Sequence, residues 1–69
     1  MSNQDLSEAE TLYLIGIGSM ESGDTAYAEE CFLSALENDP FYAEAYANLG
    51  LLLDRRGAAE SAEAAIVFL

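Results

Sequence analysis

The sequence contains no histidine, lysine or tryptophan, and its 69 residues include one cysteine and one proline. The single Cys31 excludes an internal disulfide framework, because a disulfide needs two thiols. Without histidine, one cysteine cannot assemble a zinc site of nitrogen and sulfur ligands. The same absences remove most groups that activate a nucleophile or relay a proton. The sequence therefore predicts a protein that is not an enzyme and binds no metal or cofactor.

Positive charge is also scarce. Thirteen acidic residues face two basic ones, Arg55 and Arg56, for a formal net charge of −11. This charge repels a phosphate backbone and an anionic membrane surface, so we expect neither nucleic-acid nor membrane binding. The acidic balance either favours a basic peptide partner or serves mainly to keep the protein soluble, and the scattering of the acids favours solubility.

Long apolar runs are missing as well. None approaches the ~20 residues needed to span a bilayer, and the N-terminus lacks the basic region and apolar core of a secretory signal. The apolar fraction of 52% is too high for intrinsic disorder. We therefore expect a cytoplasmic protein that forms one small domain or part of one.

The apolar residues that are present recur at intervals of three and four, which is typical of helices. The pattern predicts four helices, over residues 9–21, 25–38, 41–56 and from 58 onward. Ser7 with Glu10 fits a capping box at the first helix start. Gly23 fits a helix end, Asp24 fits the next N-cap, and Gly57 is expected to repeat the role of Gly23. Short connections between such helices give antiparallel pairs.

A shift of 34 residues aligns the sequence with itself, which indicates stacked supersecondary units. Gly16 then falls on Gly50, Gly23 on Gly57, Ala28 on Ala62 and Phe32 on Ile66. The predicted packing faces are Leu12, Ile15, Gly16 and Ser19; then Ala28, Cys31, Phe32, Ala35 and Leu36; then Tyr46, Leu49, Gly50 and Leu53. Gly16 and Gly50 are expected to face Ala28 and Ala62 in close crossings. Leucine at either glycine should then unfold the chain by overpacking.

These residues resemble the tetratricopeptide repeat, whose pattern is W-x2-L-G-x2-Y, then A-x3-F, then P. The first copy reads Leu12, Ile15-Gly16, Ser19, Ala28, Phe32 and Pro40, and the second reads Tyr46, Leu49-Gly50, Leu53, Ala62 and Ile66. Leu12 and Ser19 replace aromatic residues, and the second copy stops before its terminal proline. The division is an N-terminal segment at 1–8, a first repeat at 9–42 and an incomplete second repeat at 43–69.

The resemblance implies an all-α fold of antiparallel helix-turn-helix hairpins, stacked as a right-handed superhelix of four helices. The first helix of each hairpin would line a concave groove that binds a peptide or protein. The partner-binding residues would be Tyr13, Leu14, Ile17, Met20, Asn48, Leu51 and Arg55. The apolar strip at Tyr13, Ile17 and Met20 is either this contact surface or a covered part of the core. Asn48 either grasps a peptide backbone through its amide or is simply solvated.

Three functions are compatible with this pattern. The first is a protein-interaction scaffold or adaptor that belongs to a longer repeat protein. The second is a self-associating unit, most readily a dimer, whose interface would include the apolar residues Ile66, Phe68 and Leu69. The third is the N-terminal repeat region of a larger enzyme, such as a glycosyltransferase.

Overall fold

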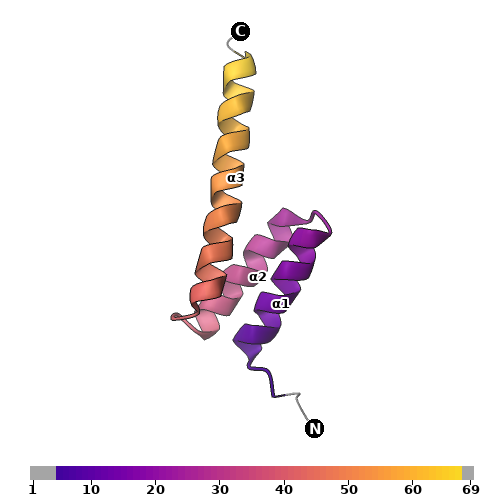
Figure 1. The fold of residues 1–69 in the computed structure, drawn as a ribbon, viewed down its shortest axis with the longest axis vertical. Helices are drawn as coiled ribbons and strands as arrows, with labels where there is room; N and C mark the ends of the chain where they lie inside the picture. Colours follow the sequence, from indigo (N-terminus) through magenta and orange to yellow (C-terminus); the bar gives the residue numbers. More distant parts are fainter. Residues whose placement is uncertain (1–4, 68–69) are drawn as a thin grey trace.

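The protein is all-helical over the part of the chain that the structure describes. The computed structural model describes the backbone of residues 5–67 and the side chains of residues 5–57. Its helices are α1 (Glu8–Glu21), α2 (Thr25–Asn38) and α3 (Ala43–Val67), and no strand occurs among these residues. α1 and α2 form an antiparallel hairpin, and α3 runs back along α2 and continues past the hairpin (Figure 1). The all-α class and the first helical hairpin are thus confirmed.

The start of α1 is set by the predicted capping box. The Ser7 Oγ accepts a hydrogen bond from the Glu10 backbone N–H at 3.1 Å, and the Glu10 Oε1 accepts one from the Ser7 N–H at 2.8 Å. Each side chain satisfies a backbone donor that has no partner within the helix. The two residues therefore fix the first turn of α1 from purely local chemistry.

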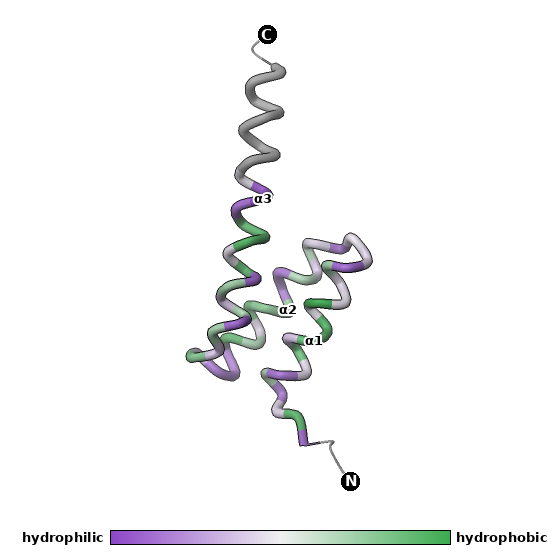
Figure 2. The backbone as a smooth tube through the Cα atoms, viewed as in Figure 1, coloured by the Kyte–Doolittle hydropathy of each residue, from purple (hydrophilic) through white to green (hydrophobic). Residues whose placement is uncertain are grey.

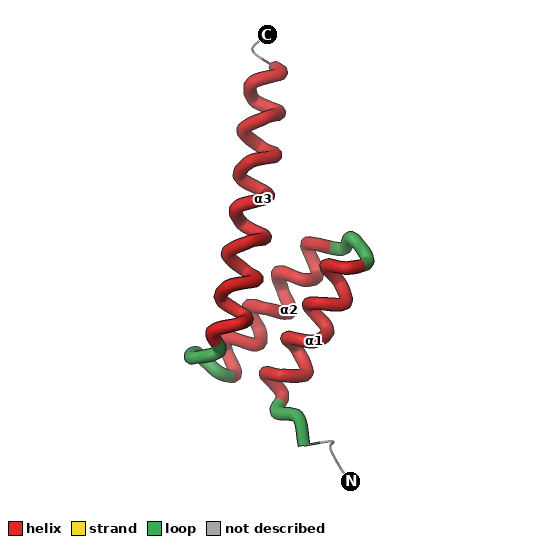
Figure 3. The backbone as a smooth tube through the Cα atoms, viewed as in Figure 1, coloured by secondary structure: helices red, strands yellow, loops and turns green. Residues whose placement is uncertain are grey.

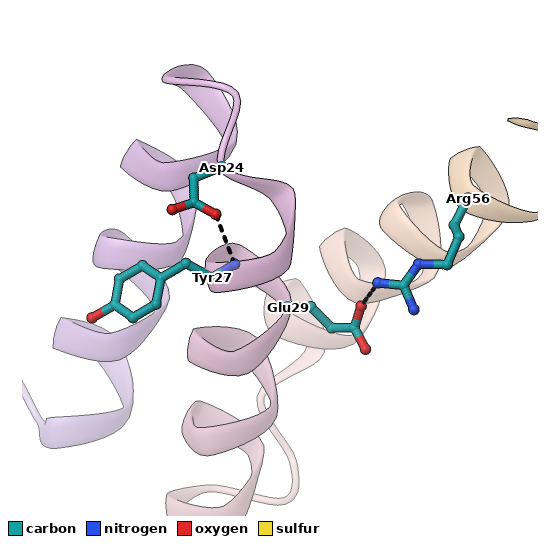
Figure 4. Close-up of polar contacts among 4 residues, drawn as sticks. All are labelled: Asp24, Tyr27, Glu29 and Arg56. Carbon is teal, nitrogen blue, oxygen red and sulfur yellow. Dashed lines mark hydrogen bonds and ion pairs between the residues drawn. The ribbon is translucent and has the colours of Figure 1, made fainter.

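The turn between α1 and α2 also follows the prediction. Gly23 has a φ of 90°, a conformation that side-chain-bearing residues avoid. Asp24 then caps α2 by accepting a hydrogen bond from the Tyr27 backbone N–H at 3.1 Å (Figure 4). Asp39 ends α2 in an extended conformation directly before Pro40. Both connections between helices are short, as Figure 3 shows.

The predicted break at Gly57 does not occur. α3 continues as one helix to Val67, so the described residues form three helices where the sequence predicts four. Gly57 lacks the positive φ of Gly23. Gly23 is followed by Asp24, a good N-cap, whereas Gly57 is followed by two alanines, which favour the helix interior most strongly. A glycine alone is therefore too weak a signal to end this helix.

The core lies between α1, α2 and α3. Figure 2 shows that each of these helices carries hydrophobic positions, some of which are buried and some exposed. The buried cluster consists of Ala28, Phe32, Leu49 and Leu52, and the half-buried side chains of Tyr13, Ile17, Met20 and Leu36 pack against it. Cys31 and Ala35 are also buried, so the predicted core face of α2 is confirmed. Cys31 is a free thiol inside this helix pair.

The predicted close crossing at Gly16 is present, and the atoms nearest to it belong to the ring of Phe32. A Cβ placed on Gly16 would lie 2.6 Å from the Cε1 atom of the Phe32 ring, which is much closer than atoms tolerate. Gly50 differs, because a Cβ there would meet no atom of the described residues within 4 Å. The prediction that leucine at Gly50 overpacks the chain therefore has no supporting contact in the described part of the structure.

Two of the predicted packing faces need further correction. On α3, Tyr46 and Leu53 are 56% and 47% exposed, while Ala45 and Leu52 are buried in their place beside Leu49. On α1, Ile15 is 42% exposed. The sequence pattern placed Tyr46 and Leu53 on the packing face of the third predicted helix, whereas the buried positions Ala45 and Leu52 each lie one residue earlier.

An ion pair links α3 to α2 on the outside of the core. The Arg56 guanidinium pairs with the Glu29 carboxylate, and both side chains keep access to solvent (Figure 4). Such exposed pairs contribute at most about 1 kcal/mol. None of the helices searched in the described part of the chain has the length and apolarity needed to traverse a lipid bilayer.

Candidate protein-interaction surface

Tyr13 joins all three helical segments at one point. Its ring centroid lies 5.8 Å from that of Phe32 on α2 and 5.1 Å from that of Tyr42, which precedes α3. Its hydroxyl oxygen accepts a hydrogen bond of 3.2 Å from the amide of Asn48 on α3. Tyr13 therefore holds α1 beside α3 through both aromatic and polar contacts.

Asn48 is committed to the fold through its amide nitrogen. Besides the bond to Tyr13, the Asn48 Nδ2 donates to the Glu44 backbone carbonyl at 2.9 Å. These two bonds use both of its N–H donors, and the amide oxygen is the remaining group with which it could meet a partner. If Asn48 contacts a partner, its side chain would therefore accept a hydrogen bond and not donate one.

An open cleft of about 520 Å³ lies between the start of α1 and the turn that leads into α3. Its lining comprises Ser7, Glu10, Asp39, Phe41, Tyr42, Ala43 and Glu44. Glu44 lies one helical turn before Asn48, and Glu10 lies one turn before Tyr13. The cleft therefore continues into the contact between α1 and α3.

The polar groups of the cleft are mostly carboxylates. Glu10 and Glu44 face it from α1 and α3, and Asp39 adds a third acid from the turn. The Asp39 Oδ1 also accepts a hydrogen bond from the Phe41 N–H at 3.1 Å, which shapes the turn. Phe41 itself is 92% exposed, so the cleft has an aromatic ring free at its rim.

The phenol of Tyr42 stays protonated in this surrounding. Burial raises the pKa of Tyr42 above its ordinary value, and the nearby carboxylates of Glu44 and Glu10 raise that pKa further. Tyr42 is therefore a neutral hydrogen-bonding group beside three acids. None of the described residues that line the cleft is basic, so the cleft favours cationic over anionic groups.

The residues predicted to bind a partner fall into two groups. Leu14 and Leu51 are 52% and 49% exposed, and Arg55 is exposed as well. Tyr13, Ile17 and Met20 are half-buried against the core. Their packing is what the covered-core alternative expects, and a direct contact between these three side chains and a partner stays a prediction.

The predicted interface residues cannot be placed in the same way. Phe68 and Leu69 lie outside the described residues, and of Ile66 only the helical backbone is described. The self-association assigned to them stays a prediction.

Sequence reasoning missed the turn residues that line the cleft. Phe41 was expected to begin the third helix, yet α3 begins at Ala43 and leaves Phe41 in the turn. A signal was available, since Asp39 and Pro40 are both typical turn residues.

The arrangement of the described helices defines a class of protein. A short-turned antiparallel hairpin followed by a helix that packs on its second member, within a sequence of 34-residue period, is an α-helical repeat. The family model described as "Tetratricopeptide repeat" matches residues 31–64, which cover most of α2 and α3. The chain therefore carries a tetratricopeptide repeat, and the resemblance read from its residues is confirmed.

Two curated relatives match nearly the whole chain. Tetratricopeptide repeat protein 8 of Homo sapiens is 38% identical over 64 residues, covering 93% of this chain and 12% of the human protein. The Mus musculus protein of the same name is 36% identical over 64 residues, which again cover 93% of this chain and 12% of the mouse protein. The chain thus spans about one eighth of the length of these relatives. No solved structure matches it.

Proposed function

We propose that this chain is a protein-interaction module that binds a basic, extended peptide segment along the side where α1 and α3 meet. We name this side the α1–α3 face, and it consists of the following residues: Glu10, Tyr13, Leu14, Glu44, Asn48 and Leu51. Membership of the tetratricopeptide repeat family supports protein interaction in general. The charge and shape of the α1–α3 face support the basic peptide.

The acidic cleft at one end of the face is the observation that carries the proposal. Glu10, Asp39 and Glu44 line a volume of about 520 Å³, which is large enough for a lysine or arginine side chain. The exposed ring of Phe41 at its rim offers a surface on which a guanidinium could stack. The net charge of −11 adds long-range attraction for a basic partner.

The rest of the face supplies apolar and backbone contacts. Leu14 and Leu51 are both about half exposed and follow the cleft along α1 and α3. The amide oxygen of Asn48 would accept a hydrogen bond from a peptide N–H, since its donors are engaged with Tyr13 and Glu44. A peptide of alternating basic and apolar character fits this sequence of contacts.

The test is a binding assay with an arrayed library of short synthetic peptides of varied charge. We expect the retained peptides to be rich in arginine or lysine, and their binding to weaken as salt rises, because exposed charges are screened. The double variant Glu10→Gln with Glu44→Gln should weaken that binding about tenfold, which corresponds to about 1.4 kcal/mol. Glutamine keeps the capping box of α1, so the fold is preserved.

The matched control is Glu21→Gln with Glu37→Gln, which removes the same charge from exposed helix positions outside the cleft. This control should retain at least most of the affinity. Equal loss in both double variants would show that only net charge matters. Retention of neutral or acidic peptides would contradict the proposal.

The finer features predicted from the sequence belong to the same proposal. We place the repeats at 9–42 and 43–69, after the N-terminal segment 1–8, in a right-handed superhelix that continues in a longer cytoplasmic repeat protein. Such a superhelix needs a helix against the far side of α3. That helix would come either from this chain, through a break at Gly57, or from a second copy.

A further inference from the structure

One side of α3 carries four residues whose charge changes sign from one end to the other. Glu44, Asn48, Leu51 and Arg55 follow one another at spacings of four, three and four, and we name them the α3 stripe. At 100° per residue they fall within about 60° of the helix circumference. Because Asn48 bonds to Tyr13 of α1, the stripe lies on the side of α3 that faces α1. Its first member lines the acidic cleft, and its last member is an exposed arginine.

The two arginines of α3 are neighbours in the sequence but face different ways. Arg56 pairs with Glu29 of α2, as Figure 4 shows. Arg55 lies about 100° around the helix from Arg56, toward α1. Among the side chains that the structure describes, Arg56 and Glu29 form the one ion pair. Asp54 precedes Arg55 directly, and adjacent helix residues do not face each other. The guanidinium of Arg55 is therefore available to an anionic group of a partner.

The distance between the two ends of the α3 stripe sets a length for what binds along it. Eleven residues separate Glu44 from Arg55, which is about 16 Å along the helix axis. An extended peptide advances about 3.3 Å per residue, so about five of its residues span this distance. Side chains on the same side of an extended peptide are an even number of residues apart. Separations of four and six residues therefore fit, because long side chains at the two ends take up the difference.

We infer that the partner carries two opposite charges at a fixed separation: a basic residue for the cleft, and an aspartate or glutamate side chain four to six residues away for Arg55. This inference rests on the proposed function and adds the second charge to it. A guanidinium holds a carboxylate through two parallel hydrogen bonds. The exposed side of Leu51 and the amide oxygen of Asn48 contact the residues in between.

The second charge makes the surface selective among basic peptides. A uniformly basic segment places a cation against Arg55, and like charges that meet across an interface weaken binding. A segment with an acid at the right separation meets attraction at both ends of the α3 stripe. The pattern of charge along the peptide, and not its net charge alone, then decides which basic segments bind.

The probe is a fluorescein-labelled synthetic peptide, with two arginines followed by alternating valine and threonine, added to the full chain and followed by fluorescence anisotropy. One glutamate replaces a threonine at each even separation from the second arginine in turn. We expect separations of four and six to bind about threefold more tightly than the peptide without glutamate. A separation of two should bind more weakly than that reference, because its glutamate lies against the acids of the cleft. A second series has the arginines at the other end, and the series that shows the optimum gives the direction of the peptide.

Arg55→Gln should abolish the advantage of the glutamate peptides, so that they bind like the reference. The matched control is Arg56→Gln, which removes the same charge from the neighbouring residue on the side of α2 and should keep the advantage. Arg55→Glu should invert the preference, so that lysine in place of the glutamate then binds more tightly than the reference. Circular dichroism should show unchanged helicity in the Arg55 variants, because this side chain is exposed.

The outcomes separate this inference from the proposed function. If the reference peptide binds and Glu10→Gln with Glu44→Gln weakens it, while glutamate gives no advantage at any separation in either series, the inference is overturned and the proposed function stands. Equal loss of the advantage in Arg55→Gln and Arg56→Gln would also overturn the inference, since net charge would then explain it. If no basic peptide binds, the proposed function fails and the inference fails with it.

Discussion

The α1–α2 hairpin and α3 contain glycines at matching positions of the 34-residue repeat. These matched glycines nevertheless differ in their contacts and in their backbone conformation. Gly16 lies under the fully buried ring of Phe32, while Gly50 faces open space. Gly23 turns the chain with a φ of 90°, while Gly57 stays helical. The difference teaches that two glycines 34 residues apart need not share a conformation or a packing role. The residue after each glycine matters, because Asp24 can cap a new helix and Ala58 cannot.

The largest expected effect is on the hairpin itself. Phe32→Ala should cost about 3–5 kcal/mol, because the side chain is fully buried and the cavity cannot collapse onto a glycine. That loss is comparable with the whole stability of a small domain, so the variant should be largely unfolded at room temperature. Chemical denaturation followed by circular dichroism measures it. Phe41→Ala, at a 92% exposed position, should leave the midpoint unchanged.

The next effect compares two glycines of the same helix. Gly16→Ala should lower stability by about 1–3 kcal/mol, because its Cβ would lie 2.6 Å from Phe32. Gly18→Ala should raise stability by up to about 1 kcal/mol, since alanine favours the helix and space is open. Thermal melting of both variants gives the sign of each change. If the melting temperatures of both variants shifted in the same direction, Gly16 and Gly18 would not differ in packing as described.

The smallest effect concerns the ion pair that ties the two regions together. Arg56→Ala should lower stability by at most about 1 kcal/mol, because Arg56 and Glu29 both remain partly exposed. The difference from the unaltered chain should shrink at high salt. Arg55→Ala removes a neighbouring charge that is also exposed, and it should have less effect. Melting at two salt concentrations tests both variants, and equal losses would mean that the pair carries no specific stabilisation.

The sequence was sufficient for features that depend on neighbours along the chain. The capping box at Ser7 and Glu10, the turn at Gly23 and the N-cap at Asp24 each involve residues within one helical turn, and all are present. The bounds of α2 were predicted without error for the same reason. Local hydrogen-bonding chemistry decides these points before any tertiary contact forms.

The sequence was insufficient where the outcome depends on distant groups. At Gly57 the chain could either turn or stay helical, and it stays helical. Neither the glycine itself nor its 34-residue spacing from Gly23 predicts which of the two forms. The cleft arises only when the start of α1 meets the turn around Phe41. Asn48 was predicted as a free amide, and its bond to Tyr13 joins residues 35 positions apart in the chain. Such contacts are set by the packing of whole helices.

The short turn between α1 and α2 has a consequence for the order in which the protein folds. Gly16 and Phe32 meet after closure of a small loop, and loops of about ten residues close in about 10–100 ns. We expect the hairpin to form early and to offer a template on which α3 docks.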